Sequence, residues 1–321
     1  MLLPLLSIAA GFVLLMISAE YTVRGAVAIA NKLRIPTIII GLTIVAFGTS
    51  MPEFVVSVSA AVQGVAGISI GNVVGSNIAN ILLILGVSAM IYPLSCPRRV
   101  FIRDYLFLFA VTVLFMLFAL GGVLVRWQGI VMLALLAAFL IYNYRNSKKS
   151  DVSGEALSPL RNSSWGVVTA ITAAGLTGII YGSDLLVDGA VALARQLGVS
   201  EETIGLTIIA FGTSLPELAT SGMAAFRRQN GVALGNVIGS NIWNIVFIMG
   251  ATSAITDVSV AAQFIHYDLW VMIGATLLLF VMMSTKNVLS RGEGLIFTTG
   301  YLCYLLSQIL ISKGIWTIGG Y

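Results

Sequence analysis

One apolar motif occurs twice in this chain, and each copy ends in a proline followed by a glutamate. The first copy runs from Gly41 to Glu53 and the second from Gly205 to Glu217, with eleven of 13 positions identical. An ionisable side chain within an apolar membrane segment is costly, so it indicates a functional site by default. Two such glutamates in duplicated, interrupted apolar segments predict an ion or substrate site where two structural repeats meet.

A second motif follows each copy at the same distance. Gly71–Ile81 and Gly235–Ile245 share nine of 11 residues. Both pairs of motifs are separated by 164 positions, with no gap between them. The chain is therefore built from two related halves.

The composition is that of an integral membrane protein. Hydrophobic residues make up 58% of the chain and charged residues only 9%, whereas a soluble domain carries about 25% charged residues. No positively charged region precedes the first apolar run, so we expect that run to be a true span and not a cleaved signal peptide. No basic cluster with interleaved aromatic residues occurs, so we expect no nucleic-acid binding.

Apolar stretches long enough to cross a bilayer as helices, which takes about 20 residues, occur ten times. The predicted spans are 3–30, 37–62, 67–92, 103–123, 127–144, 165–194, 203–226, 231–255, 265–284 and 293–313. A polar linker over 145–164 separates two halves of five spans each, 1–144 and 165–321. Because five is odd, the second half enters the membrane from the opposite side.

We therefore expect an all-α membrane protein in which residues 1–321 form a single transport domain. Its ten transmembrane helices would form two inverted-topology five-helix repeats, with helices 2 and 7 broken. The charge distribution orients this arrangement in the membrane. Of 17 Lys and Arg residues, 13 fall on the side of the linker, three on the other side and Arg24 within the first span. This predicts a multi-pass protein of the plasma or inner membrane with a cytoplasmic linker and both termini outside the cytoplasm.

Two of the seven prolines, Pro52 and Pro216, interrupt predicted spans. Proline removes a backbone donor and clashes with the carbonyl four residues earlier, so the helical ladder opens there. The freed carbonyls, over 46–49 and 210–213, need partners because lipid offers none. A bound cation is one such partner. A neighbouring Ser or Thr relieving an ordinary kink is the alternative for a single copy, but two copies followed by glutamate favour the cation.

The side chains around each glutamate offer oxygen and neither thiolate nor imidazole. Helical spacing puts Ala46, Thr49 and Ser50 on the face of Glu53, and it repeats this set as Ala210, Thr213, Ser214 and Glu217. Four further polar residues come from the second motifs: Ser76, Asn80, Ser240 and Asn244. Oxygen ligands suit hard cations such as Ca²⁺ and Na⁺, and two carboxylates balance one divalent or two monovalent ions.

The two pairs of motifs resemble the alpha repeats of the cation/Ca²⁺ exchanger superfamily, and they are most similar to those of prokaryotic sodium/calcium exchangers. The resemblance rests on Gly-Thr-Ser-Met-Pro-Glu53, on Gly-Thr-Ser-Leu-Pro-Glu217 and on the Gly-Asn-Val-X-Gly-Ser-Asn segments that end at Asn77 and Asn241. It covers nearly the whole chain.

This resemblance implies antiport by alternating access, in which Na⁺ and Ca²⁺ compete for one cluster of sites. It implies that the first and sixth spans slide across a static core. The ligands it implies for the ions are Ala46, Thr49, Ser50, Glu53, Ser76, Asn80, Ala210, Thr213, Ser214, Glu217, Ser240 and Asn244. Some archaeal relatives carry Asp where this chain has Asn244, so here the site has two carboxylates. Ca²⁺ and Na⁺ are substrates, and we expect no cofactor.

Three other functions compete with sodium/calcium exchange. A H⁺/Ca²⁺ antiporter of the same superfamily typically carries Glu near Gly75 and Gly239, where this chain has glycine. An intramembrane phosphatase needs cationic groups to hold phosphate, and neither motif has a nearby Lys or Arg. A passive cation channel is disfavoured by the paired broken helices, which favour a closed midplane site. We therefore expect a transporter and not an enzyme.

The remaining ionisable groups have simpler interpretations. Glu20 and Arg24 lie four residues apart, which predicts an ion pair within one helix. Their counterparts, Asp184 and Asp188, are interpreted as a solvated helix end, with attraction of cations to an entrance as the alternative. The two cysteines have no metal-binding or redox spacing.

Overall fold

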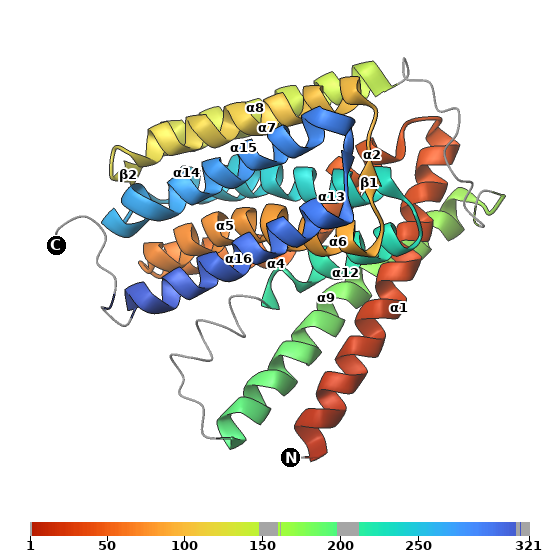
Figure 1. Ribbon diagram of the computed structural model, residues 1–321, viewed down its shortest axis with the longest axis horizontal. Helices are drawn as coiled ribbons and strands as arrows, with labels where there is room; N and C mark the ends of the chain where they lie inside the picture. The colour runs from red at the N-terminus through yellow and green to blue at the C-terminus, as the bar shows by residue number, and fades with distance from the viewer. Residues whose placement is uncertain (1, 148–159, 161, 198–211, 313–314, 316–321) are drawn as a thin grey trace.

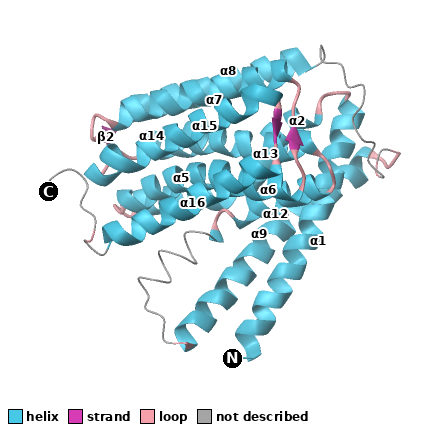
Figure 2. Ribbon diagram, in the orientation of Figure 1, coloured by secondary structure: helices cyan, strands magenta, loops and turns pink. Residues whose placement is uncertain are grey.

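The computed structural model describes residues 2–147, 160, 162–197, 212–312 and 315, and almost all of them are helical (Figures 1 and 2). The first half contains α1 Leu2–Leu33, α2 Thr37–Ile40, the π-helix η1 Gly41–Val45, α3 Ala46–Thr49, α4 Met51–Val62, α5 Ala66–Ala79, the π-helix η2 Asn80–Leu85, α6 Gly86–Ile91, β1 Leu94–Ser95, α7 Arg98–Ala119, β2 Val123–Leu124 and α8 Arg126–Ser147. The second half contains α9 Trp165–Gln196, α12 Leu215–Phe226, α13 Asn230–Ile242, the π-helix η4 Trp243–Met249, α14 Gly250–Ile255, β3 Val258–Ser259, the π-helix η5 Phe264–Asp268, α15 Leu269–Lys286, β4 Val288–Leu289 and α16 Arg291–Ser312.

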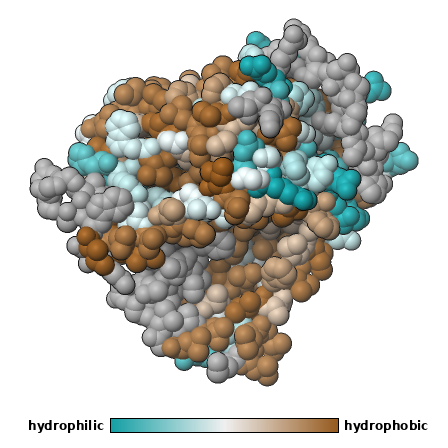
Figure 3. Space-filling model, in the orientation of Figure 1, coloured by the Kyte–Doolittle hydropathy of each residue, from teal (hydrophilic) through white to brown (hydrophobic). Residues whose placement is uncertain are grey.

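The prediction of a helical membrane protein is confirmed. Among the described residues, eight helices are long and apolar enough to cross a membrane, and the bent pair Thr37–Thr49 and Met51–Val62 makes a ninth candidate. All nine match predicted spans. Of the seventh predicted span only α12 and the turn before it are described, because residues 203–211 lie outside the described part of the chain. Hydrophobic residues cover most of the described surface on the face seen in Figure 3.

The longest two helices, α1 and α9, lie side by side and run at an angle to the rest of the molecule (Figure 1). Glycines allow their backbones to approach closely. A Cβ atom at Gly182 would lie 2.8 Å from the backbone nitrogen of Leu15, and one at Gly175 would lie 2.9 Å from that of Thr22. Small residues at a contact are the usual means by which membrane helices pack closely.

Helix α13 lies at the centre of the molecule and packs against η1, α2 and α12. The span formed by α13, η4 and α14 is 94% buried over its most apolar window, so it faces protein and not lipid. A Cβ atom at Gly239 would lie 2.7 Å from Cα of Leu42, and one at Gly235 would lie 3.1 Å from Cα of Gly41. Glycine at these two positions therefore allows α13 to pack closely on the first half, whereas nothing lies within 4 Å of a Cβ atom at the corresponding Gly75.

Two very short β-ladders add to the predicted all-α fold. Leu94 of β1 pairs with Leu289 of β4, and Leu124 of β2 pairs with Val258 of β3, both antiparallel. β1 and β3 belong to different ladders, and they occupy corresponding positions in the two halves. Leu94 and Val258 are 164 positions apart, which is the spacing of the repeated motifs. The ladders lie at the two ends of α7, which runs between β1 and β2 (Figure 1).

Candidate functional site

Both glutamates follow a break in the helix, as the prolines predict. In the first copy the chain leaves helical geometry at Ser50 (φ −86°, ψ 8°), and the segments on either side are bent by 47°. In the second copy Ser214 has nearly the same conformation (φ −87°, ψ 1°). Pro52 and Pro216 then stand in the first turn of α4 and α12, where a missing N–H is tolerated. Each glutamate therefore lies in the first turn of a new helix.

The predicted ligands are almost all in the interior. Ten are buried: Ala46, Thr49, Ser50, Glu53, Ser76, Asn80, Ser214, Glu217, Ser240 and Asn244. Thr213 is half-buried, and Ala210 lies outside the described residues. Glu53 and Glu217 are each only 1% exposed, so neither carboxylate is solvated by bulk water.

Contacts between the two halves bring the two motif copies to one place. The Ser50 hydroxyl donates to Oε1 of Glu217 across 3.0 Å, although the two residues belong to different copies. Ser240, from the second motif of the second half, donates to the same oxygen across 3.3 Å. The carboxylates of Glu53 and Glu217 are near enough to interact electrostatically. The sequence places these residues 164 positions apart, and the fold places them in one cluster.

Several oxygens of the predicted ligands are buried and have no hydrogen-bond partner among the described residues. They are Oε2 of Glu53, Oε2 of Glu217, Oδ1 of Asn80 and Oδ1 of Asn244. A buried polar atom without a partner is costly, and a bound ion is one explanation for such an atom in a native fold. Two carboxylate and two amide oxygens are hard donors that suit an alkali or alkaline-earth cation.

Two asparagines that the sequence reasoning did not select hold the cluster together. Asn72 donates to the carbonyl of Glu53 (3.0 Å) and to the hydroxyl of Ser57 (2.8 Å). Asn236 donates in the same way to the carbonyl of Glu217 (3.5 Å) and to the hydroxyl of Ser221 (2.9 Å). Each asparagine therefore ties the glutamate-bearing helix of its own half to the next helix.

The same asparagines also accept bonds from the opposite half. The Thr49 hydroxyl lies 3.2 Å from Oδ1 of Asn236, and the Thr213 hydroxyl lies 3.4 Å from Oδ1 of Asn72. Both asparagines are identical in the two copies of the second motif, and this was the signal available in the sequence. The crossed pairing itself could not be inferred because it depends on how the halves dock.

The carbonyl of Ala46 is not open in this conformation. It accepts the N–H of Ser50 at 3.0 Å and lies 3.3 Å from the Thr49 hydroxyl. Because a carbonyl oxygen has two lone pairs, an ion at Ala46 requires the Thr49 hydroxyl to rotate away. Asn80 and Asn244 lie in η2 and η4, and π-helical segments of this kind occur frequently at functional sites.

A cavity of about 520 Å³ reaches the cluster from the side of α9 and α4. Its lining includes Pro52 and Thr213 from the two glutamate motifs and Asp184 and Asp188 from α9. Both aspartates are exposed, as a solvated helix end requires, and they also face the approach to the cluster.

The predicted ion pair between Glu20 and Arg24 is present, and a second cation joins it. Arg227, at the end of α12, donates to the other carboxylate oxygen of Glu20 and so links α12 to α1. The sequence interpretation missed this partner because it lies 207 positions away. Among the described residues, no group of three or more His, Cys, Asp or Glu side chains forms a metal cluster.

Known proteins resemble this chain over nearly its whole length. The family model for sodium/calcium exchanger protein matches residues 3–145 and 167–310. The chain is 33% identical to the sodium/calcium exchanger MaX1 of Methanosarcina acetivorans, over 92% of this chain and 95% of that protein. It is 33% identical to inner membrane protein YrbG of Escherichia coli, over 97% of this chain and all of that protein.

A solved structure of the sodium-calcium exchanger NCX_Mj, soaked with zero Na⁺ and Ca²⁺, superimposes with a TM-score of 0.84. The two sequences are 32% identical, and the match covers 96% of this chain and 99% of that one. The fold, the doubled motifs and the family match agree over almost the entire length. The chain belongs to the sodium/calcium exchanger family, a family of membrane cation antiporters and not of enzymes.

Proposed function

We propose that this protein exchanges Na⁺ for Ca²⁺ by alternating access at a single site near the middle of the membrane. In this proposal the ligands are the twelve residues predicted from the sequence, and Ca²⁺ and Na⁺ are the substrates. Residues 1–321 form one transport domain of ten spans in two inverted repeats. The domain lies in the inner membrane with both termini outside the cytoplasm.

The observation that carries the proposal is the set of four partnerless, buried oxygens on Glu53, Glu217, Asn80 and Asn244. Buried carboxylates without a counter-ion are strongly disfavoured, so a cation is required whenever both are ionised. The donors to these carboxylates in the described structure are hydroxyl groups and backbone amides, which do not neutralise charge. One Ca²⁺, or two Na⁺, balances the pair.

Neutral oxygens favour Na⁺ as the coupling ion. The hydroxyls of Thr49, Ser50 and Ser240, together with the amides of Asn80 and Asn244, exceed what one Ca²⁺ needs beside two carboxylates. Several Na⁺ ions need additional neutral ligands, whereas a proton needs only a carboxylate. MaX1 is named a sodium/calcium exchanger, which agrees with this assignment.

Two structural features support alternating access. The cavity lined by Asp184, Asp188 and Thr213 leads toward the cluster from one flank. The close, glycine-rich contact packs α1 and α9 tightly on each other, as a pair that can move together against the remaining helices. A site between inverted repeats is the usual arrangement in such transporters.

Flux into vesicles tests the proposal. Purified protein is reconstituted with Na⁺ inside, diluted into Na⁺-free medium containing Ca²⁺, and Ca²⁺ uptake is measured. We expect an outward Na⁺ gradient to drive uptake and a pH gradient without Na⁺ to drive little. Uptake that a pH gradient drives without Na⁺, and that added Na⁺ does not change, would instead assign H⁺/Ca²⁺ antiport.

A further inference from the structure

A buried carboxylate outside the glutamate cluster has no assigned role. Asp268 ends η5, at the beginning of a membrane span, and is 1% exposed. An acid within a span carries a functional expectation of its own because burying its charge is costly. Neither repeated motif contains it, and it plays no part in the exchange site described above.

All hydrogen-bond partners of Asp268 given by the structure are neutral. The Tyr304 hydroxyl and the Gln308 amide both donate to Oδ1, across 2.9 Å and 2.6 Å. Gln263 donates in turn to Oε1 of Gln308 across 3.0 Å. The second oxygen, Oδ2, is buried and has no hydrogen-bond partner among the described residues. Two donors on one oxygen stabilise an ionised carboxylate, but nothing in this arrangement balances its charge.

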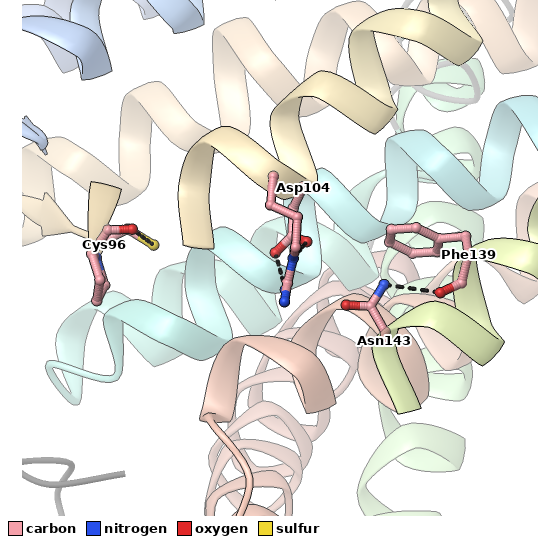
Figure 4. A network of polar contacts seen from close by, with 6 residues as sticks. Cys96, Asp104, Phe139 and Asn143 are labelled. Atoms are coloured by element: carbon pink, nitrogen blue, oxygen red, sulfur yellow. Dashed lines mark hydrogen bonds and ion pairs between the residues drawn. The ribbon is translucent and has the colours of Figure 1, made fainter. Parts of the chain in front are cut away.

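The corresponding residue of the first half shows how such a charge is balanced. Asp104 lies 164 positions earlier, is fully buried, and accepts two bonds from Arg103 at 2.7 Å and 3.0 Å (Figure 4). The counterpart of Arg103 in the second half is Tyr267, whose hydroxyl donates to Ser307 across 2.7 Å. The chain therefore keeps the buried acid in both halves but keeps its cationic partner in only one.

We propose that Asp268 is the charged ligand of a second cation site, which takes one monovalent cation where the first half uses Arg103. One carboxylate balances one positive charge, so a divalent ion is disfavoured. Na⁺ and H⁺ both satisfy this chemistry. The Tyr304 hydroxyl oxygen lies against the carboxylate and, with the partnerless Oδ2, offers oxygen ligands that suit Na⁺, whereas H⁺ needs only Oδ2.

No ion pair of the described residues includes Asp268. His266 is on the same π-helix but is exposed, and Tyr267, Tyr301 and Tyr304 are neutral phenols around the site. Helix α5, which packs against η5, has no charged residue. The basic residues of α7 are at its beginning, next to β1. The other end of α7 leads to β2, which pairs with β3, and η5 with Asp268 follows β3 in the chain. Lys286 and Arg291 are at the far end of α15 and at the adjacent start of α16.

Thermal unfolding of purified full-length protein tests the site separately from the exchange site. The background carries Glu53→Gln and Glu217→Gln, which remove both charges of the exchange site. The unfolding temperature is measured against Na⁺, with choline holding ionic strength constant, and separately against pH. We expect Na⁺ or acid to raise the unfolding temperature and Asp268→Asn to abolish that rise. Na⁺ dependence identifies a sodium site, and dependence on acid alone identifies a proton site.

Two further variants complete the test. Asp104→Asn is the matched control, because Asp104 is the first-half counterpart of Asp268 and Arg103 already neutralises it. In this variant Na⁺ or acid should still raise the unfolding temperature. Tyr304→Phe keeps the carboxylate and removes one donor, so it should shift the rise to higher ion concentration even where Asp268→Asn does not fold. No rise with either ion in the background protein, or an unchanged rise in the Asp268 or Tyr304 variants, overturns the proposal. None of these results bears on Na⁺/Ca²⁺ exchange at the glutamates.

Discussion

At the scale of single residues, the two glutamates are equivalent in sequence but differ in their contacts. Glu217 receives hydroxyl donors from both halves, Ser50 and Ser240, and still has one partnerless oxygen. Glu53 also has a partnerless oxygen and is joined to Asn72 through its carbonyl. The cluster is therefore held mainly by neutral groups, which under the proposed function leaves both charges for the transported ion.

Neutralising either glutamate should abolish Ca²⁺ transport. Glu53→Gln and Glu217→Gln keep the shape of the side chain and remove one of two charges that face a divalent ion. Loss of one partner from a buried charge pair costs on the order of 3–5 kcal/mol, which is more than 100-fold in affinity. Vesicle flux at graded Ca²⁺ measures the effect, with the exposed Asp257→Asn as control. Near wild-type affinity in either variant would show that the glutamate is not a ligand.

Removing the Asn236 side chain should weaken the site without removing any charge. Asn236→Ala loses the bonds to Glu217 and Ser221 and leaves Thr49 without its partner in the other half. Unmade buried hydrogen bonds cost about 1–3 kcal/mol, so we expect a lower unfolding temperature and weaker Ca²⁺ binding. Gln63→Ala, which removes an exposed amide bonded only within its own helix, should change neither. Unaltered Ca²⁺ affinity in Asn236→Ala would exclude this positioning role.

The candidate ligands could be predicted from the sequence because repetition marks them. Glu53 and Glu217 stand out as carboxylates in apolar segments, and spacing adds the hydroxyls near them. The contact of Thr49 with Asn236 and that of Arg227 with Glu20 could not be predicted. Both join residues nearly 200 or more positions apart, and helical periodicity carries no information about which helix faces which.

At the scale of the elements, glycine decides how closely α13 packs on the first half. A methyl group at Gly239 would lie 2.7 Å from Cα of Leu42, and backbone cannot move aside as a flexible side chain can. We expect Gly239→Ala to destabilise the fold by roughly 1–3 kcal/mol. Gly274→Ala on α15 is the control, because nothing in the described structure lies within 4 Å of that methyl position. Equal unfolding temperatures of the two variants would contradict this packing.

The ion pair between Glu20 and Arg227 should favour the conformation described here. It links α1 to α12, whereas Asp184 and Asp188, at the positions that correspond to Glu20 and Arg24, face a cavity and have no such cation among the described residues. Arg227→Gln removes the bond that holds α1 to α12 in this conformation. The protein should then spend less time with the cavity open, so access to the cavity from outside should fall.

Labelling of Val187→Cys, which lines the cavity, by an impermeant maleimide reports that access after Cys96 and Cys303 have been replaced by serine. We expect slower labelling in Arg227→Gln. Arg228→Gln should leave the labelling rate unchanged, because it removes the neighbouring charge but no bond to α1. Equal rates in the two variants would show that the ion pair does not bias the conformation.

Hydropathy predicted the spans well because lipid demands long apolar helices, and the nine matching spans begin and end within a few residues of their predicted bounds. It missed the π-helical segments at Asn80 and Asn244 and the two short ladders. Those features depend on which backbone groups pair, and hydropathy does not report pairing. The Ser50 break was predictable because Pro52 cannot donate a backbone bond.

At the scale of the whole molecule, the 164-residue spacing recurs in features that the motifs do not contain. It relates β1 to β3, Asp104 to Asp268, and η2 to η4. The two ladders each join one strand from the first half to one from the second, at opposite ends of α7. This arrangement is what two repeats of opposite orientation produce, and it supports the proposed topology.

Accessibility tags test that topology. We expect tags at both termini to be reachable from outside the cell and a tag within residues 145–164 to be reachable only after the membrane is permeabilised. The reason is the division of basic residues, 13 on the side of the linker and three on the other. Termini on opposite sides of the membrane would exclude an even number of spans and with it the inverted repeat.

The central claim is that one Ca²⁺ is held jointly by glutamates from both halves. Anomalous scattering from crystals soaked in Ca²⁺ tests it most directly. We expect one peak between the carboxylates of Glu53 and Glu217, within about 2.3–2.6 Å of an oxygen from each. The peak should disappear when excess Na⁺ replaces Ca²⁺. A peak that contacts only one of the two glutamates, or that lies away from both, would show that the two halves do not share the ion.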